Sequence, residues 1–163
     1  MDSEVKLLLE RADNTIIGAK ALNKLSEGGE EAVSLKIPEG TTFYSLVISQ
    51  SYYAIFYSAK AYLSFKGINL GSKQGQHQLV YFKFKDLVKK KIIDEELLKI
   101  YEEVKIKAED LLEILSEERD KRKKFTYEIH SQANKEPAEQ SLNNAQLFIG
   151  HIKQFIEKGD KGE

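Results

Sequence analysis

Apolar residues recur every three or four positions along most of the chain, which is the spacing of amphipathic α-helices. Residues 4–25 have charged residues between the apolar positions, and this predicts a helix of roughly six turns. Helical spacing returns over residues 77–92 and 95–129, and again after Pro137, which suits the first turn of a last helix. No stretch has the alternating pattern of a strand. The sequence therefore predicts an all-α fold, an up-and-down bundle of about five helices.

The second predicted helix, residues 43–67, is apolar on almost every side. Thr41 and Thr42 are candidates for its N-cap, and Gly67 is a candidate for its C-terminal stop. A helix with so little polar surface belongs in the middle of a bundle, so we interpret its aromatic residues as core rather than as an exposed stacking platform. Residues 26–40 read as an irregular loop inside one domain, because neither flanking helix buries its apolar face alone. The whole chain, 1–163, is expected to be a single domain.

Composition narrows the classes of function. The chain has no cysteine and a net charge of -1, so any site for a polyanion must be a local patch. His77, His130 and His151 fall on three different segments without metal-binding spacing, and no phosphate-binding glycine loop occurs, so we expect neither a metal nor another cofactor. No segment approaches about 18 uninterrupted apolar residues. We therefore expect a cytoplasmic protein without a membrane segment.

One local patch stands out at residues 119–130, "RDKRKKFTYEIH". It begins with the candidate phosphate- or RNA-binding residues Arg119, Lys121, Arg122, Lys123 and Lys124. Tyr127, Glu128 and His130 follow and supply a phenol, a carboxylate and an imidazole. Arginine presents a planar fork of donors that fits phosphate. Further lysines at residues 83–91 extend the basic surface if the two helices are neighbours. The alternative is that these charges only solvate helix ends.

The stretch "SYYAIFYSAKAYLSFKGI", residues 51–68, resembles the second helix of the HEPN family, the higher eukaryotes and prokaryotes nucleotide-binding domain. Small helical members also carry a histidine-bearing turn after this helix and an arginine motif in a late helix. Here His77 and Arg122 occupy those places in the same order. The resemblance covers roughly residues 41–156.

This resemblance implies a helical bundle that dimerises, often through the faces that bear the late motif. Many catalytic members are metal-independent endoribonucleases with an arginine followed by a histidine five or seven residues later. In those members the histidine is thought to transfer protons and the arginine to hold the phosphate. Several members are toxins whose antitoxin is a minimal nucleotidyltransferase. The resemblance thus implies a homodimer and a nucleotidyltransferase-type partner.

This chain departs from the catalytic motif. Tyr127 lies five residues after Arg122, and His130 lies eight after it. Tyrosine with a pKa near 10 is a poor general base at neutral pH. Three hypotheses stay open: an RNA- or nucleotide-binding protein of a toxin-antitoxin-like pair, a metal-independent endoribonuclease that uses Arg122, Tyr127 and His130, and a non-catalytic interaction module.

Overall fold

The computed structural model describes residues 2–71, 75–121 and 135–160, and for residues 112–121 it describes the backbone alone. Every regular element in the described residues is a helix, which confirms the predicted all-α class. The helices are α1 (Ser3–Ser26), α2 (Glu30–Ser34), α3 (Tyr44–Phe65), α4 (Gln76–Lys89), α5 (Glu95–Lys121) and α7 (Lys135–Asp160). Five of them correspond to the predicted helices, and the short α2 lies in the segment expected to be irregular.

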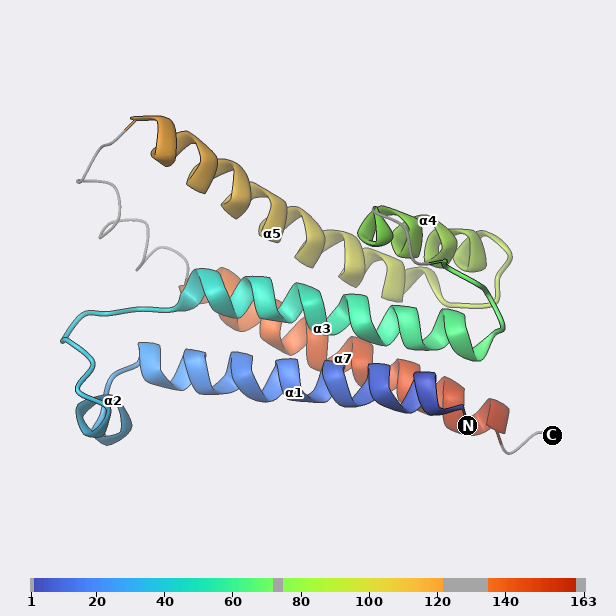
Figure 1. Ribbon diagram of the computed structural model, residues 1–163, viewed down its shortest axis with the longest axis horizontal. Helices are drawn as coiled ribbons and strands as arrows, with labels where there is room; N and C mark the ends of the chain where they lie inside the picture. Colours follow the sequence, from blue (N-terminus) through green and yellow to red (C-terminus); the bar gives the residue numbers. More distant parts are fainter. Residues whose placement is uncertain (1, 72–74, 122–134, 161–163) are drawn as a thin grey trace.

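The long helices α1, α3, α5 and α7 run in alternating directions, as expected for an up-and-down bundle (Figure 1). α3 packs against α1, α7, α5 and α4, so it occupies the centre. α4 lies beside the first half of α5, and the other half of α5 diverges from the bundle (Figure 1). The central position predicted for the second helix is therefore confirmed.

Small residues line the buried sides of α3. Ser51, Ala54, Ser58, Ala59 and Ala61 have no exposed surface. Each buried serine satisfies its hydroxyl within the helix, because Ser51 donates to the carbonyl of Val47 at 2.8 Å and Ser58 donates to that of Ile55 at 3.0 Å. Small side chains without unpaired polar atoms let the neighbouring helices approach α3 closely.

Buried aromatic rings join α4, α5 and α7 in the core. Phe84 of α4, Tyr101 of α5 and Phe148 of α7 are fully buried, with ring centroids 5.3–5.9 Å apart. These three residues lie on the apolar faces that the spacing predicted. The prediction that this helix is core on almost every side is wrong at Leu46 and Tyr53, which are 48% and 40% exposed. Both lie on a face of α3 that no other helix covers completely.

α3 begins at Tyr44, one residue later than the predicted start at residue 43. Its N-cap is Phe43, which provides no side-chain cap, and Thr41 and Thr42 lie in the preceding loop. The backbone N–H of Phe43 instead donates to Ser26 Oγ at 2.7 Å, and that hydroxyl donates to the carbonyl of Leu22 at 2.7 Å. The last residue of α1 therefore caps the start of α3 from outside, a long-range contact that local sequence does not reveal.

Candidate functional site

The basic stretch at residues 119–130, which we call the late basic stretch, begins near the C-terminal end of α5. Arg119 and Lys121 lie in its last turn, where the structure describes the backbone only. The other candidate residues, Arg122, Lys123, Lys124, Tyr127 and His130, lie outside the described residues. The described part of α5 reaches the residue before Arg122, and its second half leaves the bundle.

The lysines of α4 lie far from the described part of that stretch, the backbone of residues 119–121. Lys85 of α4 lies 3.4 Å from Glu102 of α5, whereas Lys121 follows Glu102 by 19 residues, or about 28 Å along a helix axis. Among the described residues, the α4 lysines therefore lie about five helical turns from Lys121, while Arg122, Lys123 and Lys124 lie outside the described residues. α4 lies at the opposite end of α5 (Figure 1).

Some α4 lysines are already paired with carboxylates. Besides the Lys85–Glu102 pair, Lys90 lies 2.7 Å from Asp86 one turn earlier. Lys83 and Lys89 are exposed and have no ion pair of ordinary length among the described residues. Their field lowers the pKa of Asp86, although the hydrogen bond from Lys90 is the largest cause. α4 thus presents a modest basic surface that salt would screen.

The described residues also bring a histidine and several aromatic residues together at the start of α4. Gly75 precedes the helix with a φ of 84°, a left-handed conformation that glycine adopts readily. This turn places His77 against α3. Its ring stacks on Phe56 with centroids 4.0 Å apart and an interplanar angle of 17°. His77 Nδ1 lies 3.0 Å from the hydroxyl of Tyr52.

Burial lowers the pKa of His77, and the positive charge of Lys60 lowers it further. The imidazole is therefore neutral at neutral pH. Burial raises the pKa of Tyr52 to about 12, with a smaller contribution from Glu109, so its hydroxyl keeps its proton. If Tyr52 donates to Nδ1, the ring proton of His77 is on Nε2. This pair holds the imidazole in a defined orientation, and its hydrogen bond is worth about 1 kcal/mol.

Further tyrosines connect this histidine to α5. Tyr101 stacks beside Tyr52 with centroids 6.3 Å apart and lies 5.7 Å from the ring of Tyr81. Tyr81 donates to Glu102 at 2.5 Å and accepts from Lys85 at 3.2 Å. The Tyr101 hydroxyl is buried and makes no hydrogen bond of ordinary geometry within the described residues. Burial raises the pKa of this phenol, so it stays neutral.

The sequence pointed to His77 only as the histidine of a turn, and it did not reveal this cluster. The partners come from α3, α4 and α5, so no spacing along the chain brings them together. The adjacent pair Tyr52 and Tyr53 was the available signal. A helix that is otherwise core would place two consecutive tyrosines on different faces, and one of them must approach the surface.

Two further observations bear on the kind of site. In the part of the chain that the structure describes, no three His, Asp or Glu side chains are arranged to hold a metal ion. No helix there is both long and apolar enough to span a bilayer.

Comparison with curated proteins and with solved structures gave no significant match. The family model described as "HEPN domain" matches residues 5–155, which include the central helix α3, His77 and the late basic stretch. This match covers most of the chain. The chain therefore belongs to the HEPN domain family, a membership that points to a nucleotide- or RNA-related function.

Proposed function

We propose that this protein binds RNA or a nucleotide through Arg122 and the basic residues around it, as a homodimer paired with a nucleotidyltransferase-type partner. The observation that carries the proposal is the family match over residues 5–155, because it includes both arginines of the late stretch. A net charge of -1 gives the molecule no general attraction to nucleic acid, so binding must depend on such a local group.

The position of α5 supports this proposal. Its second half diverges from α3 and leads directly into Arg122, so the helix carries the start of the basic stretch away from the rest of the bundle (Figure 1). Arg119 and Arg122 are three residues apart in the sequence, and guanidinium groups form forked, charge-assisted hydrogen bonds to phosphate.

The test is RNA binding at several salt concentrations, measured by fluorescence anisotropy in EDTA. We expect the Arg119→Ala/Arg122→Ala variant to bind more weakly and to show a shallower dependence of log K on log salt, by roughly 0.7 for each phosphate of a single strand that the variant no longer neutralises. Lys20→Ala removes one charge from the exposed side of α1 and serves as the control. Unchanged binding by the double arginine variant would reject the proposal.

The same samples test the alternative of a metal-independent endoribonuclease that uses Arg122, Tyr127 and His130. Cleavage of mixed RNA in EDTA that disappears in Arg122→Ala and in His130→Ala supports this alternative. Intact RNA at high protein concentration supports binding without cleavage. Co-purification with the product of a neighbouring nucleotidyltransferase gene, and light scattering of the isolated protein, test the proposed partner and the homodimer.

A further inference from the structure

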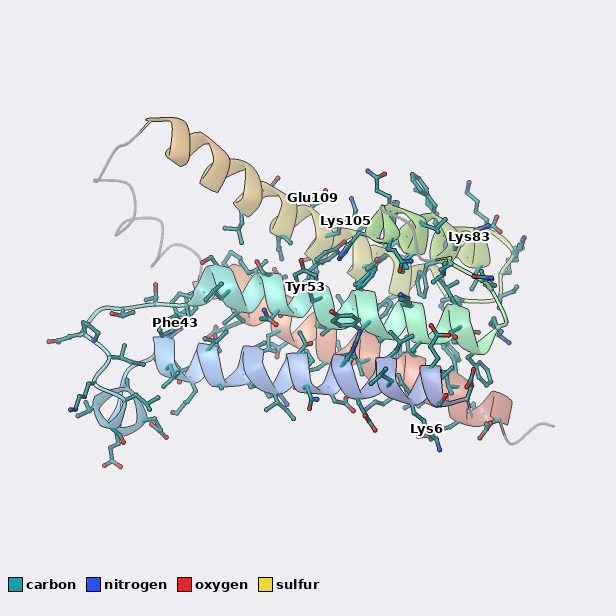
Figure 2. The ribbon with its side chains drawn as sticks, in the orientation of Figure 1. Lys6, Phe43, Tyr53, Lys83, Lys105 and Glu109 are labelled. Atoms are coloured by element: carbon teal, nitrogen blue, oxygen red, sulfur yellow. The ribbon has the colours of Figure 1, made fainter. Side chains whose placement is uncertain are left out.

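One face of the central helix α3 carries aromatic rings to the surface. Leu46, Tyr53, Tyr57 and Lys60 are spaced by seven, four and three residues, so they share a side of the helix. Tyr53 is 40% exposed and Tyr57 is half-buried, although the rest of α3 is mostly core. Figure 2 shows Tyr53 midway along α3, with Lys105 and Glu109 on the neighbouring α5. We call Tyr53, Tyr57 and the cations beside them the tyrosine stripe.

Neighbouring rings hold the stripe in place. The Tyr53 ring centroid lies 5.8 Å from that of Tyr52, 6.4 Å from that of Tyr57 and 5.4 Å from that of His77, which meets it edge-on. Tyr52 and His77 are themselves fixed by their hydrogen bond. The Tyr53 ring is therefore already ordered, so a flat ligand that stacks on it would lose little binding free energy to the ordering of this side chain.

Two cations lie next to these rings. The Arg11 guanidinium of α1 is 6.0 Å from the Tyr57 ring centroid, and Lys60 Nζ donates to the amide oxygen of Gln76 at 2.6 Å. Neither forms an ion pair of ordinary length with a carboxylate in the described residues. On the α5 side, Lys105 and Glu109 neutralise each other at 2.7 Å. The unpaired charges beside the stripe are therefore positive along most of its length. At its far end lies the carboxylate of Glu4, which accepts a hydrogen bond from Ser64.

We propose that the tyrosine stripe is a second RNA contact, on which unpaired bases stack while Arg11 and Lys60 meet the adjoining phosphates. Rigid aromatic rings beside cations are the combination with which proteins hold single-stranded nucleic acid. This inference rests on the proposed function and adds to it a surface formed by α3 and α1. Stacking of one base on such a ring changes affinity by roughly 5- to 150-fold.

The charges favour RNA over a second copy of this chain as the occupant. A two-fold interface is self-complementary, so the stripe of one copy would face the stripe of the other. Arg11 and Lys60 would then enter the interface from both copies. Because Glu109 is already paired with Lys105, Glu4 at the far end is the carboxylate left among the described residues to balance them, so an excess of positive charge would be desolvated at a cost. Phosphates supply that missing negative charge.

The experiment compares a single-stranded RNA 10-mer with a 10-mer of the same backbone that lacks bases. We expect Tyr53→Ala to weaken binding of the RNA by about 5-fold or more and to leave binding of the abasic strand unchanged. Tyr53→Phe keeps the ring and should bind as the unaltered protein does. Phe82→Ala removes another exposed aromatic, on α4, and is the matched control. Far-UV circular dichroism checks that each variant is folded, and Tyr53→Leu repeats the test if Tyr53→Ala unfolds.

The outcomes separate this inference from the proposed function. If Arg122→Ala weakens binding of both strands but Tyr53→Ala weakens binding of neither, the proposal that the stripe binds RNA is wrong and the proposed function stands. If the unaltered protein binds neither strand, both are wrong. If Tyr53→Ala instead changes the molar mass by light scattering, the stripe is an interface between copies and the proposal fails.

Discussion

His77 stacks on Phe56 with ring centroids 4.0 Å apart, and this contact joins the start of α4 to the centre of the bundle. Lys60 and Gln76 connect the same two helices by a hydrogen bond of 2.6 Å. The hydrogen bond between the Tyr52 hydroxyl and His77 Nδ1 then fixes the orientation of the imidazole. The position of α4 therefore depends on a titratable side chain, which leads to the first prediction.

Acidification should destabilise the protein through His77. Because its folded-state pKa lies below the ordinary value of 6.5, the unfolded chain takes up the proton more readily. The stability that neutral His77 contributes is complete above pH 6.5 and is lost as the pH falls through the lower, folded-state pKa. The groups that face it are Tyr52, Tyr53 and Lys60 of α3 and Glu109 of α5 through Tyr52.

Urea unfolding from about pH 8 to about pH 5 measures this effect. His77→Phe keeps a ring against Phe56 but cannot take up a proton, so its stability should fall less steeply with acidity. The exposed His151 on α7 provides the control, and His151→Gln should behave as the unaltered protein does. Identical pH dependence in His77→Phe and the unaltered protein would contradict the prediction.

Two neighbouring tyrosine hydroxyls should have opposite effects on stability. Tyr52→Phe removes the hydrogen bond to His77 and should lower the free energy of unfolding by about 1 kcal/mol. Tyr101→Phe removes a buried hydroxyl that interacts with the Tyr52 hydroxyl but makes no hydrogen bond of ordinary geometry among the described residues, so it should leave stability unchanged or raise it by about 1 kcal/mol. Chemical denaturation at neutral pH compares the two variants, and each is the other's control. A destabilisation by Tyr101→Phe as large as that by Tyr52→Phe would show that its hydroxyl is bonded.

Two glycines of α7 should respond differently to the same substitution. A Cβ added at Gly150 meets nothing within 4 Å, so Gly150→Ala should stabilise the helix by up to about 1 kcal/mol. A Cβ at Gly159 would lie 2.8 Å from the ring of Phe65, which must shift to admit it. Thermal unfolding should therefore show a gain for Gly150→Ala and a smaller gain or a loss for Gly159→Ala. Equal gains at both sites would mean that Phe65 moves freely.

An ion pair between the first and last helices should contribute little. Lys153 Nζ of α7 lies 2.7 and 2.8 Å from the two carboxylate oxygens of Asp13 of α1. Both side chains are more than a third exposed, so solvent screens their attraction. A double-mutant cycle with Asp13→Asn and Lys153→Met should give a coupling of no more than about 1 kcal/mol, which decreases with added salt. A larger coupling would indicate that the pair is dehydrated.

The sequence was sufficient for the helices because burial on one side imposes a regular spacing. Val80, Phe84, Leu87 and Val88 repeat at three- and four-residue intervals, and all four are buried in the structure. The same reasoning failed for Tyr53, since hydrophobic character alone does not say whether a neighbouring helix covers a given face. Coverage depends on how the other helices pack, and that is a property of the whole bundle.

The candidate site was less predictable for a related reason. The basic residues after Arg119 are adjacent in sequence and therefore visible as a motif. The group around His77 is assembled from three helices, and the separation of the α4 lysines from Arg119 and Lys121 depends on the length of α5. Distances of this kind follow from the arrangement of helices rather than from composition. The family resemblance pointed to the central helix and to the arginine motif, but it did not reveal the contacts between helices.

The hydrogen bond from the N–H of Phe43 to Ser26 Oγ closes the base of the segment between α1 and α3. The two ends of that segment are therefore held together by the residues that flank it, independently of contacts within the segment. Insertions or deletions between Glu27 and Thr42 change the length of a loop whose two ends stay together. The packing of α1 against α3 therefore does not depend on the length of this loop. Related chains can differ here in size and in the surface they present while the helices on either side keep the same alignment.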